Sequence, residues 1–113
     1  MPRLQYNGSI LIPQLDVART FWSRSKGLLG RHELLENQGM WIHQCNSIHT
    51  FFMKFAIDCV FVDQELKVKK IFHNVQPWRL IFPVWKASSV FELPAGSVKR
   101  FALKQGEQLD VVS

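Results

Sequence analysis

The segment from His43 to Thr50 holds more side chains capable of chemistry than any other part of this sequence. It reads His43-Gln44-Cys45-Asn46-Ser47-Ile48-His49-Thr50. If residues 40–45 are extended, His43 and Cys45 point to the same face, and a turn at Asn46-Ser47 brings His49 back beside them. We therefore treat Cys45, Ser47, His49 and Thr50 as candidate binding residues.

This segment is compatible with three kinds of chemistry. Cys45 could be a nucleophile with His49 as its base, because a nearby imidazole lowers a thiol pKa. The two imidazoles and the thiol, joined by Asp58, could hold Zn²⁺, but their spacing matches no standard zinc signature, so we expect no metal and no other cofactor. In the third reading Cys45 is a small buried apolar residue, and His49 and Thr50 bond to nearby backbone.

Asp58 interrupts an apolar run at residues 55–62. It is solvated if one face of this segment meets water, and it is buried and paired if both faces are crowded. We expect the buried form, paired with an arginine. The candidates are Arg24, Arg31 and Arg79, with Arg31 preferred because it follows a glycine-punctuated helix end.

Trp78 and Arg79 lie between two prolines. An indole beside a guanidinium can form the wall of a ligand pocket, although a Trp also commonly just fills a core. Glu92 breaks an apolar strand once, as an outward-facing residue does, and we assign it no role.

The elements that would position these residues are mostly strands. Alternating or β-branched runs predict strands at Ser9–Ile12, Met40–His43, Ile57–Val62, Leu66–Phe72, Ser89–Leu93 and Leu109–Val112. The run 48–55 is a second strand or a strand and turn. Helical spacing begins at Asp16, with Thr20 as an alternative cap and Gly27 or Gly30 at the end, and a helical turn follows within 95–103. The pattern predicts an α+β, β-rich fold with a mostly antiparallel sheet or a partly closed small barrel.

Composition limits the possible functions. The 113 residues predict a single domain, 1–113, and no apolar stretch is long enough to span a bilayer. No leader pattern is present, so we expect a cytoplasmic protein in which Cys45 and Cys59 are reduced thiols. The net charge of +5 is scattered along the chain, which suits an anionic small ligand or a protein partner and disfavours nucleic acid.

An ordered series of short motifs resembles the bacterial and archaeal family known as domain of unknown function 192. The motifs are Gly27-Leu28-Leu29-Gly30-Arg31, Gly39-Met40, Asn46-Ser47-Ile48-His49-Thr50, Met53, Ile57-Asp58, Asp63, Pro77-Trp78-Arg79, Glu92-Leu93, Ala95-Gly96 and Gln105-Gly106. The resemblance covers residues 17–112. It implies a compact β-rich domain with a short helix near its start, and it supplies no reaction, substrate or cofactor.

We therefore hypothesise a small-ligand or protein-binding module. Its pocket would be lined by Cys45, His49, Asp58, Trp78 and Arg79. The alternatives are an enzyme that depends on Cys45 and His49, and a basic nucleic-acid-binding domain.

Overall fold

A five-stranded sheet forms the middle of the molecule. The computed structural model describes the backbone of residues 1–113 and every side chain except that of Phe21. The strand order is β3-β4-β9-β6-β7, formed by Gln14–Ala18, Gln38–His43, Ser89–Pro94, Ile57–Val62 and Val68–Val75. β3 and β4 are parallel and are connected through helix α1 (Phe21–Lys26), whereas the other neighbouring strands are antiparallel.

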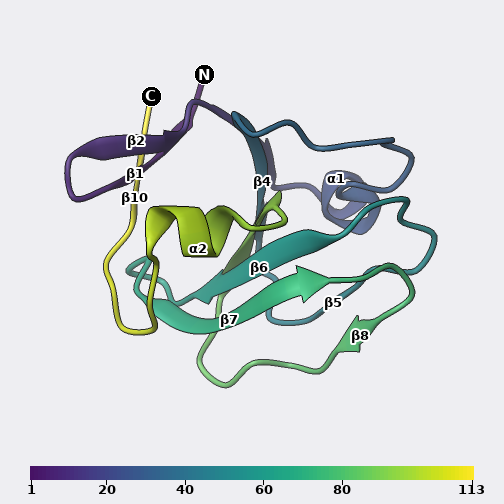
Figure 1. The fold of residues 1–113 in the computed structure, drawn as a ribbon. Helices are drawn as coiled ribbons and strands as arrows, with labels where there is room; N and C mark the ends of the chain where they lie inside the picture. Colours follow the sequence, from purple (N-terminus) through teal and green to yellow (C-terminus); the bar gives the residue numbers. More distant parts are fainter.

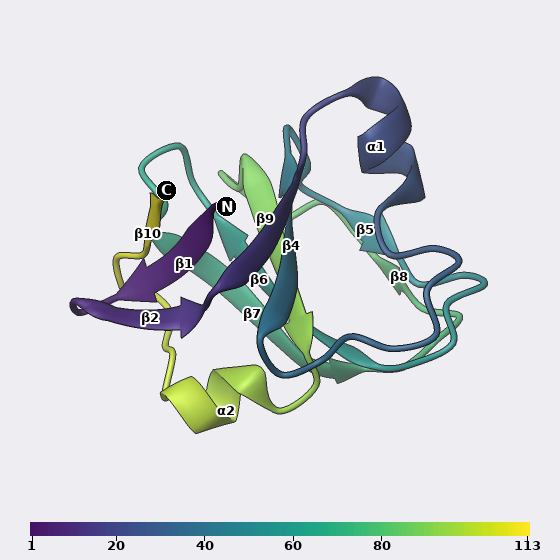
Figure 2. The ribbon, with the colours of Figure 1, turned by 90° about the horizontal axis from the view of Figure 1, so that it is seen from above.

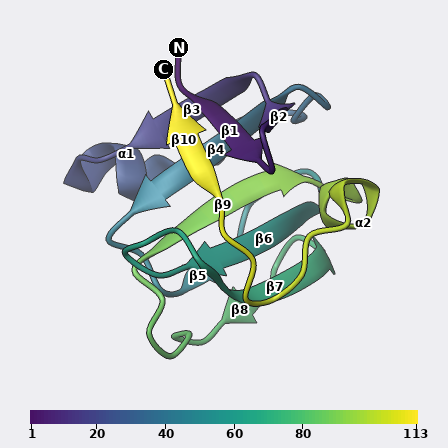
Figure 3. The ribbon, with the colours of Figure 1, turned by 90° about the vertical axis from the view of Figure 1, so that its left-hand side faces the viewer.

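Smaller elements cover both faces of this sheet. On one side lie α1 and the short pair β5 (Ile48–His49) and β8 (Leu80–Ile81). On the other side lie helix α2 (Ser97–Phe101) and the sheet of β1 (Arg3–Tyr6), β2 (Ser9–Ile12) and β10 (Asp110–Val112) (Figure 2). β10 runs beside β1 (Figure 3), so the two chain termini are neighbours (Figure 1).

The central strands are buried on both faces. All six positions of β6 and all six of β9 are buried. Ile57, Cys59 and Phe61 pack into one apolar cluster with Ile48 and Ile81 from the β5–β8 pair. Val60 and Val62, which point to the other face of β6, pack into a second cluster with side chains from β1, β2 and α2. This two-sided burial confirms that Cys59 is buried with Ile57 and Phe61.

The predicted α+β, mostly antiparallel architecture is confirmed. The strands Ser9–Ile12 and Ile57–Val62 have the predicted bounds. β7 begins two residues later than predicted, because Asp63 Oδ1 accepts N–H bonds from Glu65 and Lys67 and holds a turn there. Within the described residues the sheets stay separate and no barrel closes.

One expectation at an element boundary was wrong. Asp16 and Val17, where helical spacing was expected to begin, lie in β3 and pair in register with β4, so the helix begins at the alternative cap, Thr20. For the run 48–55 the strand-and-turn alternative is confirmed, because Ile48–His49 is a strand and Phe52, with a φ of 66°, lies in a turn. Among the described residues, no helix has the length and apolar character needed to cross a bilayer.

Candidate functional site

Glu92 lies in the middle of the apolar face of the central sheet. In β9 it is directly opposite Met40 of β4 and Cys59 of β6. Directly paired residues share a face, so its side chain enters the cluster that contains Met40, Cys59 and Ile42. Glu92 is only 3% exposed. A carboxylate at such a position is unusual, because burying it costs free energy unless it is paired.

A small pocket lies in front of the Glu92 carboxylate. It has a volume of about 170 Å³ and is lined by α1 and the turn after it, by Ile42, by residues of the segment 45–53 and by Glu92. Its apolar walls include Leu28, Ile48 and Met53. Glu92 therefore adds a carboxyl group to the apolar part of the pocket lining, whereas the basic lining residues Arg24 and Lys26 belong to α1.

The end of α1 shapes this pocket. Thr20 begins the helix, since its Oγ1 accepts the Ser23 N–H at 3.1 Å and the Ser23 hydroxyl accepts the Thr20 N–H at 3.0 Å. Gly27 ends it with a φ of 46°, a conformation that favours glycine. A Cβ at Gly27 would lie 3.8 Å from Glu92 Oε1, in van der Waals contact with the carboxylate. The glycine therefore allows the chain to turn while leaving space before Glu92.

No hydrogen bond or ion pair joins the Glu92 carboxylate to another described residue. Burial alone raises the pKa of Glu92 from 4.5 to about 7. Near neutral pH the side chain can therefore be a proton donor or an acceptor, and either form has an unused hydrogen-bonding site directed at the pocket.

Cys45 and Ser47 line the same pocket but do not form a nucleophilic site. The Cys45 thiol donates to the Ser47 carbonyl oxygen at a sulfur–oxygen distance of 3.0 Å. Burial raises the pKa of the Cys45 thiol, and the nearby Glu92 raises it further. The thiol is therefore held protonated, contrary to what a catalytic cysteine needs.

His49 is at the exposed rim of this pocket. Its Nδ1 accepts the Phe51 N–H at 3.2 Å, and its ring stacks on Phe51 with centroids 4.9 Å apart. The proton of the neutral ring is therefore on Nε2. No hydrogen bond joins His49 to Cys45 among the described residues, so the hypothesised catalytic pair is not formed.

Thr50 ties two loops together. Fully buried, it donates from Oγ1 to the Gln76 carbonyl at 2.7 Å and accepts the Arg79 N–H at 2.9 Å. This is the backbone-bonding role that we considered for Thr50 from the sequence.

Asp58 is buried as expected, but the expected arginine partner was wrong. Its Oδ1 accepts the Asn74 N–H at 2.8 Å, and its Oδ2 accepts the N–H groups of Gly96 at 3.1 Å and Val98 at 2.9 Å. The carboxylate thus caps the start of α2, where Gly96 has no side chain to do so. The preferred arginine, Arg31, instead bonds to Asp16 at 2.7 Å.

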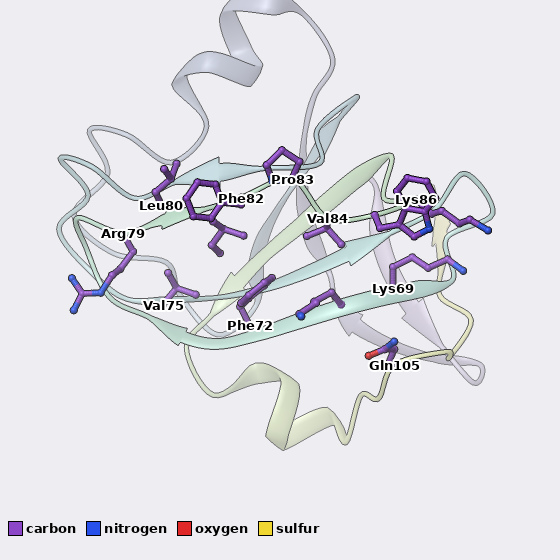
Figure 4. Close-up of a pocket in the computed structure, with 13 residues that line it drawn as sticks. Lys69, Phe72, Val75, Arg79, Leu80, Phe82, Pro83, Val84, Lys86 and Gln105 are labelled. Carbon is purple, nitrogen blue, oxygen red and sulfur yellow. The ribbon is translucent and has the colours of Figure 1, made fainter.

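Trp78 and Arg79 lie away from the Glu92 pocket. Trp78 is 57% exposed and packs against Phe52, with ring centroids 4.6 Å apart. Arg79 lines a different, larger hollow beside β7 (Figure 4). The hypothesised pocket residues are therefore divided: Cys45, Ser47 and His49 lie together, whereas Asp58, Trp78 and Arg79 lie elsewhere.

The metal hypothesis fails on geometry. Within the part of the chain whose side chains are described, no three His, Cys, Asp or Glu residues are grouped so as to hold a metal ion. His43 lines a different hollow from Cys45 and His49, and its ring packs at a tilt against Trp41, with ring centroids 4.1 Å apart.

Sequence reasoning missed Glu92. A strand with one carboxylate among apolar residues has the same sequence pattern whether that carboxylate faces water or a pocket. The signal that separates the two is in its neighbours, because Val90, Phe91 and Leu93 are apolar in both phases of the strand. Such a continuous apolar run is typical of a strand covered on both faces, where no residue points to bulk water.

Comparison with known proteins identifies relatives along nearly the whole chain. The model of DUF192, described as "Uncharacterized ACR", matches residues 3–111. A UPF0127 protein of Thermococcus sibiricus is 27% identical over 107 residues, covering 91% of this chain and 69% of that protein. One from Pyrococcus abyssi is 28% identical over 103 residues, covering 88% and 87%. A crystal structure of a protein of unknown function from Novosphingobium aromaticivorans has a TM-score of 0.83 at 22% identity, covering 96% of this chain and 82% of the other.

Proposed function

Starting from the fact that this chain belongs to the uncharacterised DUF192 family, we propose that it is a single-domain, small-ligand-binding module whose ligand donates a hydrogen bond to Glu92. The observation that carries the proposal is a buried carboxylate without a partner, directed into a pocket. The match of the DUF192 model to residues 3–111 confirms the family resemblance predicted from the sequence motifs. Because this family is uncharacterised, the ligand must be inferred from the site.

The free-energy cost of burying the unpaired Glu92 carboxylate supports a binding role. An unpaired charge in an apolar core destabilises a fold, and an apolar residue of similar volume is often neutral or stabilising in its place. Glu92 makes none of the backbone bonds that explain Asp58. A ligand that supplies the missing donor removes the penalty when it binds.

The pocket limits the size and chemistry of this ligand. A volume of about 170 Å³ is equivalent to roughly five or six water molecules of about 30 Å³ each. Apolar walls favour a short carbon skeleton, and Glu92 favours an ammonium, amide or hydroxyl group at its end. Arg24 and Lys26 also line the pocket, and the Arg24 guanidinium is held by Gln44 Oε1 at 3.0 Å.

The test compares three molecules with one carbon chain: butylammonium, butan-1-ol and butyrate. The protein, labelled with ¹⁵N, is titrated at pH 8, where Glu92 is mostly ionised, and the amide shifts of Gly27, Cys45 and Ser47 are followed by NMR. We expect butylammonium to bind about tenfold or more tightly than butan-1-ol, since hydrogen bonds to charged groups contribute about 1.5–3 kcal/mol. Butyrate is expected to bind least.

Glu92→Gln should abolish the preference for butylammonium, whereas Glu33→Gln, at an exposed site, should preserve it. Equal binding of butyrate and butylammonium by the parent protein would refute the proposal. So would an unchanged preference in the Glu92→Gln variant.

A second candidate function is proton-transfer catalysis by Glu92. It is favoured by the pKa of about 7, since a general acid or base works best when its pKa is near the working pH. In this case Glu92→Gln would abolish turnover of a bound substrate, and Cys45→Ser would leave it intact. The reverse result would restore a Cys45-dependent enzyme.

We also propose a cytoplasmic location. Two free cysteines, Cys45 and Cys59, support it, because unpaired thiols are usual where the surroundings are reducing. Alkylation of both thiols in freshly lysed cells would agree with this location, and prior oxidation of them would argue against it.

A further inference from the structure

A second and larger hollow lies on the far side of the β5–β8 pair from the Glu92 pocket. It runs between strand β7 and residues 79–86, which we call the strap (Figure 4). Its volume is about 790 Å³. This falls within the range of roughly 300–1,000 Å³ that is typical of sites for small organic molecules.

Apolar side chains form the walls of the groove. Phe72 and Val75 of β7 form one wall, and Ile81 and Val84 of the strap are almost fully buried beneath the other. Above them, large apolar side chains remain in water: Leu80 is 54% exposed, Phe82 75% and Trp85 83%. Exposed apolar groups gathered around one hollow are typical of a surface that something else covers.

The charges around the groove are positive. Lys69, Lys70, Arg79 and Lys86 line it, and no carboxylate is among its described lining residues. Lys69 is paired with Asp63 at 3.4 Å. The Lys70 ammonium lies over the Phe72 ring, 5.6 Å from its centroid. Arg79 and Lys86 form no ion pair with any residue whose side chain is described. Arg79 lies at one end of the groove and Lys86 at the other (Figure 4).

We propose that the groove binds one molecule of an anionic amphipath, a carboxylate carried on an alkyl chain. The chain lies over Phe72, Val75 and Val84, and Phe82 and Trp85 cover it. The carboxylate lies at one end of the groove, where it is attracted by one of the two cations at the ends, Arg79 or Lys86. A single alkyl chain fits into a concave, elongated groove. A membrane surface is flat and would leave the groove unfilled.

This site is separate from the Glu92 pocket, since the two sets of lining residues share no member. The two sites also differ in the charge that they favour. The groove favours an anion, whereas the Glu92 pocket favours a hydrogen-bond donor such as an ammonium group. The two proposals can therefore fail independently.

The experiment titrates the whole protein with decanoate and with decyltrimethylammonium, which have the same tail and opposite charge. Both are kept dilute enough to remain monomeric, and binding is measured by calorimetry and by the change in Trp fluorescence. We expect decanoate to bind more tightly, and we expect added salt to weaken it. Equal binding of the two molecules would overturn the proposal, because the cations would then have no role.

Variants locate the binding. Arg79→Gln with Lys86→Gln should weaken decanoate binding about tenfold, since each exposed charge contributes modestly. The matched pair Arg3→Gln with Lys99→Gln removes the same charge elsewhere and should change it less than twofold. Phe82→Ser with Trp85→Ser should weaken both ligands, and Glu92→Gln neither. Similar weakening by both charge-removing pairs would overturn the proposal, as would binding to anionic lipid vesicles without binding of monomeric decanoate.

Discussion

Replacing Asp58 with Asn tests how the carboxylate holds the fold together. The two oxygens accept three backbone N–H groups, from Asn74, Gly96 and Val98, at 2.8–3.1 Å. An Asn amide has one acceptor oxygen, and its NH₂ must face at least one of these donors. With the oxygen turned to Gly96 and Val98, the Asn74 N–H loses its acceptor, and the other two bonds lose the assistance of the charge.

The magnitude follows from these changes. An N–H group left without a partner in a buried place costs about 1–3 kcal/mol, and exchanging a charged for a neutral acceptor costs about 1 kcal/mol per bond. The expected loss in the free energy of unfolding is therefore about 3–5 kcal/mol, a large part of the stability of a small domain.

Urea denaturation followed by Trp fluorescence and by circular dichroism measures this loss. Asp16→Asn is the matched control, because Asp16 is partly exposed and paired with Arg31. Exposed ion pairs contribute less than about 1 kcal/mol, so the control should change little. A loss below about 0.5 kcal/mol for Asp58→Asn would refute the capping role. A large loss for Arg31→Gln would show that the arginine matters in a way that the structure does not explain.

Three further predictions concern Glu92, Cys45 and Thr50. Because burial raises the pKa of Glu92 from 4.5 to about 7, the folded state holds this proton longer, and the free energy of unfolding should fall by about 3 kcal/mol as pH rises from 4.5 through 7. Glu92→Gln should lack this part of the pH dependence, and Glu92→Met should be more stable than the parent at pH 8. Urea denaturation at several pH values measures both effects. If the free energy of unfolding changed equally with pH in the parent and the Glu92→Gln variant, the prediction would be contradicted. Since burial raises the pKa of the Cys45 thiol, its alkylation by iodoacetamide, measured in a Cys59→Ala background, should be slow below pH 7 and rise only at alkaline pH; rapid reaction at pH 6 would reverse that assignment. Thr50→Val should lower the free energy of unfolding by about 1–3 kcal/mol, because the Arg79 N–H loses its acceptor and the Gln76 carbonyl its donor; a thermal melt unchanged from the parent would contradict this.

The strands were predictable where both residue types and periodicity agreed. The run Ile57–Val62 is apolar or β-branched at every position except Asp58, and it forms a central strand with the predicted bounds. Residues 14–18 were not predictable in the same way, because a parallel strand depends on a partner more than twenty positions along the chain. Local spacing favoured a helix there, and pairing with β4 outweighed it.

The candidate site was predictable in part for a related reason. The sequence drew attention to the segment around Cys45 and His49, and these residues do line a pocket. The partners of Asp58 could not be predicted, since they are backbone N–H groups 16 to 40 residues away that leave no mark in the residue types. Glu92 was missed because the burial of a single charge depends on which elements cover the strand.

The ionisation of Glu92 is the most direct test of the central claim. Its side-chain carboxyl carbon can be followed by ¹³C NMR across pH 4 to 9, once in the free protein and once with saturating butylammonium. An unpartnered buried carboxyl should titrate with a pKa of about 7, and the pKa should fall when the ammonium group binds, because a cation favours the ionised form. A pKa near 4.5 in the free protein, or one that does not move when butylammonium is added, would contradict the account.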